Sequence, residues 1–125
     1  MAELILEHYA VNQKWSFKAD GKWETLIVEY LEKLARRYHE TGTGIIGHIK
    51  ALALFPDGGY LRVSVVSPTL PAGVEGSVPA GCTGLVLTLN VIVYGIGRDL
   101  LEHITGEEAT HLIDRSQGRV NIETI

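Results

Sequence analysis

Cysteine is almost absent from this chain, and Cys82 is the only one among 125 residues. A single thiol cannot form an intramolecular disulfide, and it provides no cysteine cluster for a metal ion. The chain begins MAELILEHYA, which has an acidic residue at position 3 and no long apolar run, so no signal peptide is expected. These absences favour a reduced, cytoplasmic setting and a protein without a metal or cofactor.

Long hydrophobic runs and excess positive charge are also missing. The longest nearly uncharged stretch, residues 64–96, contains Glu75, three prolines and several glycines, so it does not resemble a membrane-spanning helix. Lysine and arginine total 11 against 15 aspartates and glutamates, for a formal charge of -4. Such a charge leaves no general electrostatic attraction for nucleic acid. We therefore expect neither a membrane nor a nucleic acid as a partner.

The chain has enough apolar residues to build one domain spanning residues 1–125. Hydrophobic residues make up 46% of the chain, and its length is that of a single domain with its own core. The clearest local signal lies in residues 23–38, where apolar residues recur at spacings of three and four. This is the stripe of an amphipathic helix. The stripe comprises Trp23, Leu26, Ile27, Tyr30, Leu31, Leu34, Ala35 and Tyr38.

A β-hairpin is predicted where Pro-Asp-Gly-Gly separates two apolar runs. If those four residues form the loop, Phe55 pairs with Tyr60. The core face then carries Leu52, Leu54, Leu61, Val63 and Val65, with His48 and Lys50 at its far end. The opposite face carries Ile49, Ala51, Ala53 and Phe55 against Tyr60, Arg62, Ser64 and Val66. A slip of one residue would exchange the two faces.

Residues 68–81 predict a long loop rich in proline and glycine, and residues 84–94 predict a central strand without charges. Leu4–Val11 predicts a first strand, and residues 119–125 a last edge strand. A short helix is expected over residues 98–104, and a second over 106–113, because Thr105 and Glu108 fit a capping box. Asp20 is a candidate cap for the first helix.

The resulting order is strand, helix, three strands, helix and strand. It predicts an α+β fold: a two-layer sandwich whose mostly antiparallel sheet carries its helices on one face. The order is loosely ferredoxin-like, with an added hairpin strand, and this analogy alone implies no function.

Two glycine patterns are similar to motifs that bind nucleotides or nucleic acids. Gly42, Gly44 and Gly47 spell G-x-G-x-x-G, but a dinucleotide site needs a preceding strand and a following helix. GIIGHIKAL resembles the GXXG loop of KH RNA-binding domains, which joins two helices and clamps the nucleic-acid backbone. The resemblance lacks basic residues inside the loop, and it implies that residues 48–55 are helical. Whether residues 45–55 form a strand or a helix stays open at this point.

The best candidate site lies at one corner of the predicted hairpin. No histidine pair has the spacing of a zinc site. The hairpin register places His48 opposite Ser67 and beside Lys50, facing inward under the long loop, with Arg62 on the neighbouring strand. A lysine and a histidine that face inward are costly unless they reach water or an anion. We therefore predict a ligand site formed by His48, Lys50, Ser67 and Arg62.

Three functions are compatible with these patterns. The first is a small homo-oligomeric binding or accessory protein with a pocket for a small anionic ligand, since apolar strand faces outnumber the helices that could cover them. The second is an enzyme that uses His48 as an acid or base, with Lys50 or Arg62 holding an anionic substrate. The third is a KH-like RNA-binding module.

Overall fold

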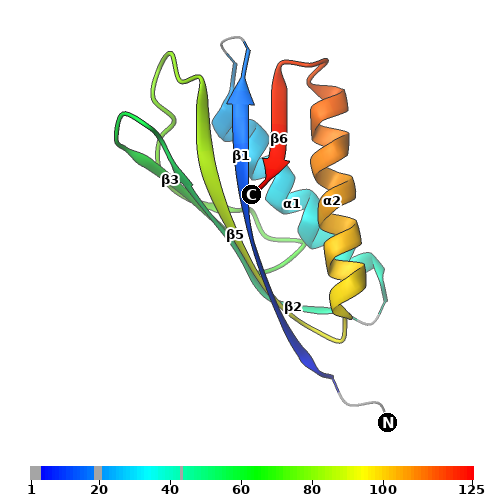
Figure 1. The fold of residues 1–125 in the computed structure, drawn as a ribbon. Coiled ribbons are helices and arrows are strands. Elements are labelled where there is room, and N and C mark those ends of the chain that lie inside the picture. The colour runs from blue at the N-terminus through cyan, green and yellow to red at the C-terminus, as the bar shows by residue number, and fades with distance from the viewer. Residues whose placement is uncertain (1–3, 19–20, 43) are drawn as a thin grey trace.

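The computed structural model describes residues 4–18, 21–42 and 44–125. Six antiparallel strands form one sheet in the order β4-β3-β2-β5-β1-β6, and two long helices lie on one of its faces (Figure 1). The strands are β1 (Leu6–Phe17), β2 (Ile45–Leu54), β3 (Tyr60–Val65), β4 (Gly73–Gly76), β5 (Gly84–Tyr94) and β6 (Val120–Thr124), and the helices are α1 (Trp23–Glu40) and α2 (Arg98–Arg115). The predicted α+β sandwich with helices on one face is confirmed.

The amphipathic stripe of α1 is the centre of the core, as its spacing predicts. Ile27, Leu31 and Leu34 are each completely buried against the sheet. Alternate residues of β5 meet this stripe, because successive side chains of a strand point to opposite faces. The buried residues of β5 are Leu85, Leu87, Leu89, Val91 and Val93. The predicted cap Asp20 lies outside the described residues.

The register of the β2–β3 hairpin differs from the predicted one by a single residue. Leu54 pairs with Tyr60, and Ala51 with Val63, so the connection contains five residues rather than four. Phe55 leaves the strand and buries its ring, while Gly58 and Gly59 both adopt positive φ angles of 91° and 95°. Two successive residues in this region require glycine. The predicted register is wrong by one residue because β2 is apolar on both faces. Its sequence pattern therefore does not show which face of the strand is buried.

This slip exchanges the faces of β2. Ile49, Ala51 and Ala53 are buried under the helices, whereas His48, Lys50, Leu52 and Leu54 lie on the uncovered face. The prediction that His48 and Lys50 face inward is therefore wrong. Because residues 45–54 form a strand, the requirement of the KH resemblance for a helix there is also contradicted.

Helix α2 is continuous, where the sequence predicted two shorter helices. Thr105 does not cap a new helix; its hydroxyl donates to the carbonyl oxygen of Leu101 one turn earlier, at 2.7 Å. Gly106 causes no break, since the helix continues through it from Arg98 to Arg115 despite the low helix propensity of glycine. The predicted loop 68–81 also contains the short edge strand β4, which pairs with β3.

The outer side of β1 is only half covered by a strand. In the described part of the chain, β6 pairs with β1 from Gln13 to Phe17. Nearer the start of β1, the guanidinium group of Arg98 donates to the carbonyl oxygen of His8 at 3.0 Å and lies over the ring of Tyr9. The first turn of α2 thus occupies a backbone acceptor that a neighbouring strand would otherwise use.

Candidate functional site

The uncovered face of the sheet brings two histidines together across its central strand. His8 of β1 and His48 of β2 are both register partners of Ile92 in β5. Two strand spacings separate them, about 10 Å between backbones, so the two histidines lie on the same face on either side of Ile92. Lys50 lies two residues beyond His48 on the same face, beside Asn90. We call His8, His48 and Lys50 the cationic cluster.

Positive charge within the cationic cluster changes the acidity of His48. Partial burial lowers the pKa of His48, and the nearby Lys50 and His8 lower it further. Each of these causes disfavours the imidazolium form. Among the described residues, the side chains of His48 and Lys50 have no hydrogen-bond or ion-pair partner. Lys50 therefore has no compensating carboxylate on this face, and it lies beside a histidine whose neutral form is favoured.

His8 is held in place by a neutral partner. Its Nε2 atom lies 3.2 Å from the Oδ1 atom of Asn90. If Nε2 carries the ring proton, the amide oxygen accepts it, and the opposite ring nitrogen remains available for another group. The Asn90 side chain is thus an orienting partner of His8, and it also lies between His8 and Lys50 in the register.

Arg62, which was predicted to take part in the ligand site, is already engaged by a carboxylate. Its Nη1 atom lies 2.9 Å from Glu75, and the Tyr60 hydroxyl donates to the same carboxylate at 2.7 Å. These two contacts lower the pKa of Glu75, with the Tyr60 hydrogen bond as the larger cause. Arg62 shares the uncovered face with Lys50, but its charge is offset by Glu75, so it adds less to the cationic cluster.

Ser67, the fourth predicted site residue, lies apart from the cationic cluster. Its hydroxyl is 3.0 Å from that of Thr69 and accepts the backbone N–H of Thr69. Ser67 borders a small hollow of about 160 Å³ together with Glu32 and Arg36 of α1. The one-residue shift of the hairpin removes the predicted pairing of Ser67 with His48, so no nucleophile–base pair forms there.

The sequence prediction missed His8 and Asn90. Alternation within residues 4–11 assigns His8 to a strand face, but only the pairing of β1 with β5 brings it close to His48. Long-range pairing of this kind leaves no local signal in a single sequence. Asn90 does leave one, since it is a polar residue inside an otherwise apolar strand.

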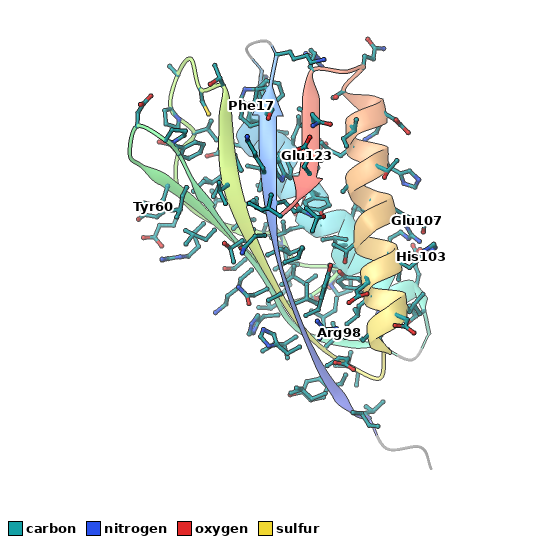
Figure 2. The ribbon with its side chains drawn as sticks, viewed as in Figure 1. Phe17, Tyr60, Arg98, His103, Glu107 and Glu123 are labelled. Atoms are coloured by element: carbon teal, nitrogen blue, oxygen red, sulfur yellow. The ribbon has the colours of Figure 1, made fainter. Side chains whose placement is uncertain are left out.

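A second group of titratable side chains joins the two helices. Arg37 of α1 contacts Glu107 at 2.9 Å and the buried Glu108 at 3.2 Å on α2. His103 and His111 lie beside the same carboxylates (Figure 2 labels His103 and Glu107). Within the described residues, no group of three or more His, Cys, Asp or Glu side chains is arranged to hold a metal ion. We therefore assign this network to the packing of α1 against α2.

In the described ranges, no helix combines the length and apolar character that crossing a bilayer requires. Comparisons with known protein families, with curated proteins and with solved structures found no match to this chain.

Proposed function

We propose that the protein is a small cytoplasmic binding protein, working as a homo-oligomer, that takes up a small anionic ligand on the uncovered face of its sheet. The observation that carries the proposal is the pair Lys50 and His48: an ammonium group without a carboxylate partner in the described chain, and beside it an imidazole that can donate a hydrogen bond to an anion. An anion between His8, His48 and Lys50 would accept charge-assisted hydrogen bonds from all three.

Binding fits this site better than catalysis does. A histidine that works as a general base is normally oriented by a third group, and among the described residues His48 has none. An enzyme remains the second candidate, because the lowered pKa of His48 keeps its imidazole in the proton-accepting form near neutral pH. Conversion of a bound ligand by the wild-type protein, lost in His48→Ala, would favour the enzyme.

Self-association is the second part of the proposal. Apolar side chains remain exposed along the sheet, including Leu6 and Ile45 beside Tyr94 at one end, and Leu54 and Val86 at the other. A second copy is a natural cover for such surface. Light scattering at micromolar concentration tests this directly, and a mass near the monomer value of 13.7 kDa would contradict it.

The ligand site can be tested with inorganic phosphate as the probe. Phosphate is titrated into ¹⁵N-labelled protein, with the amide signals of residues 48–50 and 90–92 as the readout. We expect His48→Ala and Lys50→Gln each to weaken binding about 3-fold or more, because each removes a charge-assisted contact. Lys14→Gln is the matched control, since Lys14 lies on the same face but outside the cationic cluster. Equal weakening in all three variants would show that only general surface charge attracts the anion.

The pH dependence gives a second test. An anion bound beside His48 favours its imidazolium form, so binding is coupled to proton uptake. We expect the phosphate affinity to rise as the pH falls from 8 to 5.5, although phosphate itself loses charge over this range. The same titration with sulfate, whose charge is constant there, separates the two effects. A sulfate affinity independent of pH would contradict a role for His48.

A further inference from the structure

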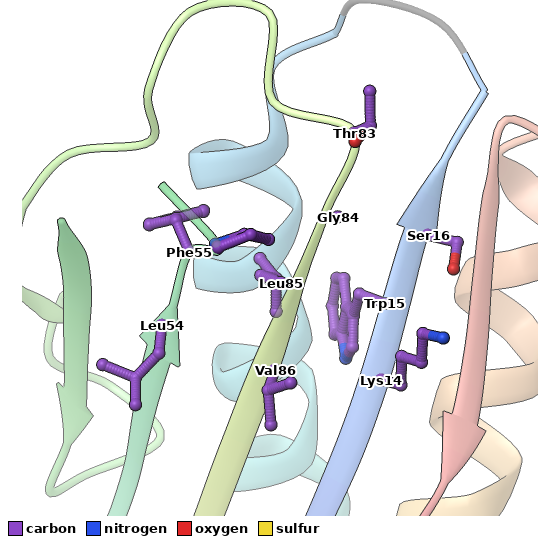
Figure 3. A pocket seen from close by; sticks show the side chains of 10 residues that line it. Lys14, Trp15, Ser16, Leu54, Phe55, Thr83, Gly84, Leu85 and Val86 are labelled. Carbon is purple, nitrogen blue, oxygen red and sulfur yellow. The ribbon is translucent and has the colours of Figure 1, made fainter. Parts of the chain in front are cut away.

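A second candidate site lies at the opposite end of the uncovered face, where β2 parts from β5. The last pair between these strands is Leu54 with Val86, whereas β1 continues beside β5 as far as Ser16 and Gly84. The start of β5 therefore has a neighbouring strand on the β1 side alone. A hollow of about 550 Å³ opens at this point, which we call the β5 hollow (Figure 3). Its volume lies within the range of pockets for small organic ligands.

The walls of the β5 hollow differ in polarity. Leu54 and Phe55 form the side toward β2, and Pro56, Leu85 and Val86 extend the apolar lining. Lys14 and Ser16 lie on β1 at the other side, and Thr83 lies at its end (Figure 3). A ligand in this hollow would thus have apolar residues on one side and Lys14, Ser16 and Thr83 on the other. The Lys14 side chain extends from β1 toward β6 in Figure 3, and its flexible four-carbon stem would have to turn for the ammonium group to reach a ligand.

Gly84 keeps the floor of the β5 hollow free of a side chain. A Cβ atom at this position would lie 2.7 Å from the carbonyl oxygen of Trp15, closer than real Cβ contacts allow. The position accepts only glycine because the backbones of β1 and β5 approach closely there. The hollow is therefore a consequence of strand pairing and does not depend on a movable side chain.

The charge of Lys14 determines the kind of ligand. Lys14 has no ion-pair partner among the described residues, although Glu123 of β6 is its register partner. A ligand with a cationic head group would be repelled by this ammonium group, whereas a ligand with a carboxylate would form an ion pair with it. A fully hydrophilic anion would gain nothing from the apolar wall.

From these features we propose that the β5 hollow binds a small amphipathic carboxylic acid, with its apolar body against Leu54, Phe55 and Val86 and its carboxylate beside Lys14. This site is separate from the cationic cluster. Ile92 follows Val86 by six positions along β5, a distance of about 20 Å along an extended strand. The inference does not rest on the anion-binding proposal above, and either can fail without the other.

The test uses three small molecules with the same eight-carbon tail and different head groups: octanoate, octanol and octylammonium. Each is titrated into the full-length ¹⁵N-labelled protein, with the amide signals of Ser16 and residues 83–86 as the readout. We expect octanoate to bind most tightly, octanol more weakly and octylammonium weakest. Octylammonium binding as tightly as octanoate would overturn the proposal, and so would the absence of any shift at residues 83–86.

Two variants locate the site. Lys14→Gln should weaken octanoate binding about 2- to 5-fold, as expected for a partly exposed charge pair, and leave octanol binding unchanged. Lys33→Gln on α1 is the matched control, because Lys33 belongs to neither proposed site, and it should leave octanoate binding unchanged. A loss caused by Lys50→Gln but not by Lys14→Gln would assign octanoate to the cationic cluster and refute a site in the β5 hollow.

A third variant tests the apolar wall. Val86 is 40% exposed at the rim of the hollow, so Val86→Trp should obstruct the hollow without disturbing the core. We expect this variant to reduce the binding of octanoate and octanol alike, with unchanged amide signals in α1 as evidence of an intact fold. Unchanged binding of both probes in an intact Val86→Trp protein would contradict the proposal.

Discussion

Tyr38 donates its hydroxyl proton to the Oγ1 atom of Thr105 at 2.6 Å, because Thr105 uses its own proton to reach the carbonyl oxygen of Leu101 at 2.7 Å. Both side chains are buried, so this chain of hydrogen bonds joins α1 to α2 in a site without water access. The direction of donation makes the two partners unequal. Tyr38 loses its only acceptor if Thr105 is removed, whereas Thr105 keeps its bond to Leu101 if Tyr38 is removed.

We therefore predict that Thr105→Val destabilises the protein more than Tyr38→Phe does. Thr105→Val leaves a buried hydroxyl without an acceptor and should cost about 1–3 kcal/mol, whereas Tyr38→Phe should cost about 0.5–1.5 kcal/mol. Urea unfolding of both variants and of the double variant measures this. The double variant should be less destabilised than the sum of the two. A larger loss for Tyr38→Phe would mean that the donor direction is wrong.

Truncating a residue at the centre of the α1 stripe should lower the free energy of unfolding more than the Thr105 and Tyr38 variants do. Leu31 is completely buried, so Leu31→Ala should lower the free energy of unfolding by about 2–5 kcal/mol. Arg36→Ala on the exposed side of the same helix is the control and should stay within about 0.5 kcal/mol. If the two variants lost similar stability, the stripe would not be the core of this fold.

Neighbouring residues of β2 test the hairpin register. Ala51 is 2% exposed beneath the helices, whereas Leu52 lies on the uncovered face. Ala51→Gln must fit a larger polar side chain into the core and should cost about 2 kcal/mol or more, whereas Leu52→Gln should cost about 1 kcal/mol or less. Chemical denaturation decides between them. The reverse order of stabilities would restore the four-residue loop that the sequence favoured.

The acidity of His48 should respond to Lys50. Burial is the largest cause of the lowered pKa of His48 and Lys50 the next, so Lys50→Gln should raise this pKa part of the way toward the ordinary value of 6.5. NMR titration of the imidazole signals measures it. Because the folded-state pKa lies below the unfolded one, the unfolded chain binds the proton first, and stability falls as the pH drops from 6.5 through the folded value. Lys50→Gln should make this fall smaller. An unchanged pKa in the variant would mean that Lys50 does not act on His48.

The elements read correctly from the sequence share one property: their pattern has a single interpretation. The stripe of α1 separates apolar from charged residues, and β5 bears leucine or valine at every second position, so burial of one face is the only solution. In β2, by contrast, Ile49, Ala51 and Ala53 compete with Leu52 and Leu54 for the core. Phe55 continues the alternation of the first set and is buried with it, but both sets are apolar, so alternation alone does not select the buried one.

The candidate site was less accessible to sequence reasoning than the fold. His48, Lys50 and Arg62 do lie on one face, but it is the uncovered face, and the ion pair of Arg62 with Glu75 depends on the unpredicted strand β4. His8 joins the cationic cluster through a pairing between residues more than 80 positions apart in the chain. The β5 hollow arises because β1 pairs with β5 as far as Gly84, whereas β2 pairs with it only as far as Val86. No residue pattern in the sequence predicts that difference.

The position of β1 in the sheet also determines when the protein can fold. Its two neighbouring strands are β5 and β6, which begin at residues 84 and 120. During synthesis β1 leaves the ribosome before either of these partners, with its apolar residues unpaired and Arg98 not yet present to occupy its edge. Contacts so distant in sequence slow folding and lengthen the time in which an unpaired strand can aggregate. Complete pairing of β1 is thus tied to the synthesis of β6.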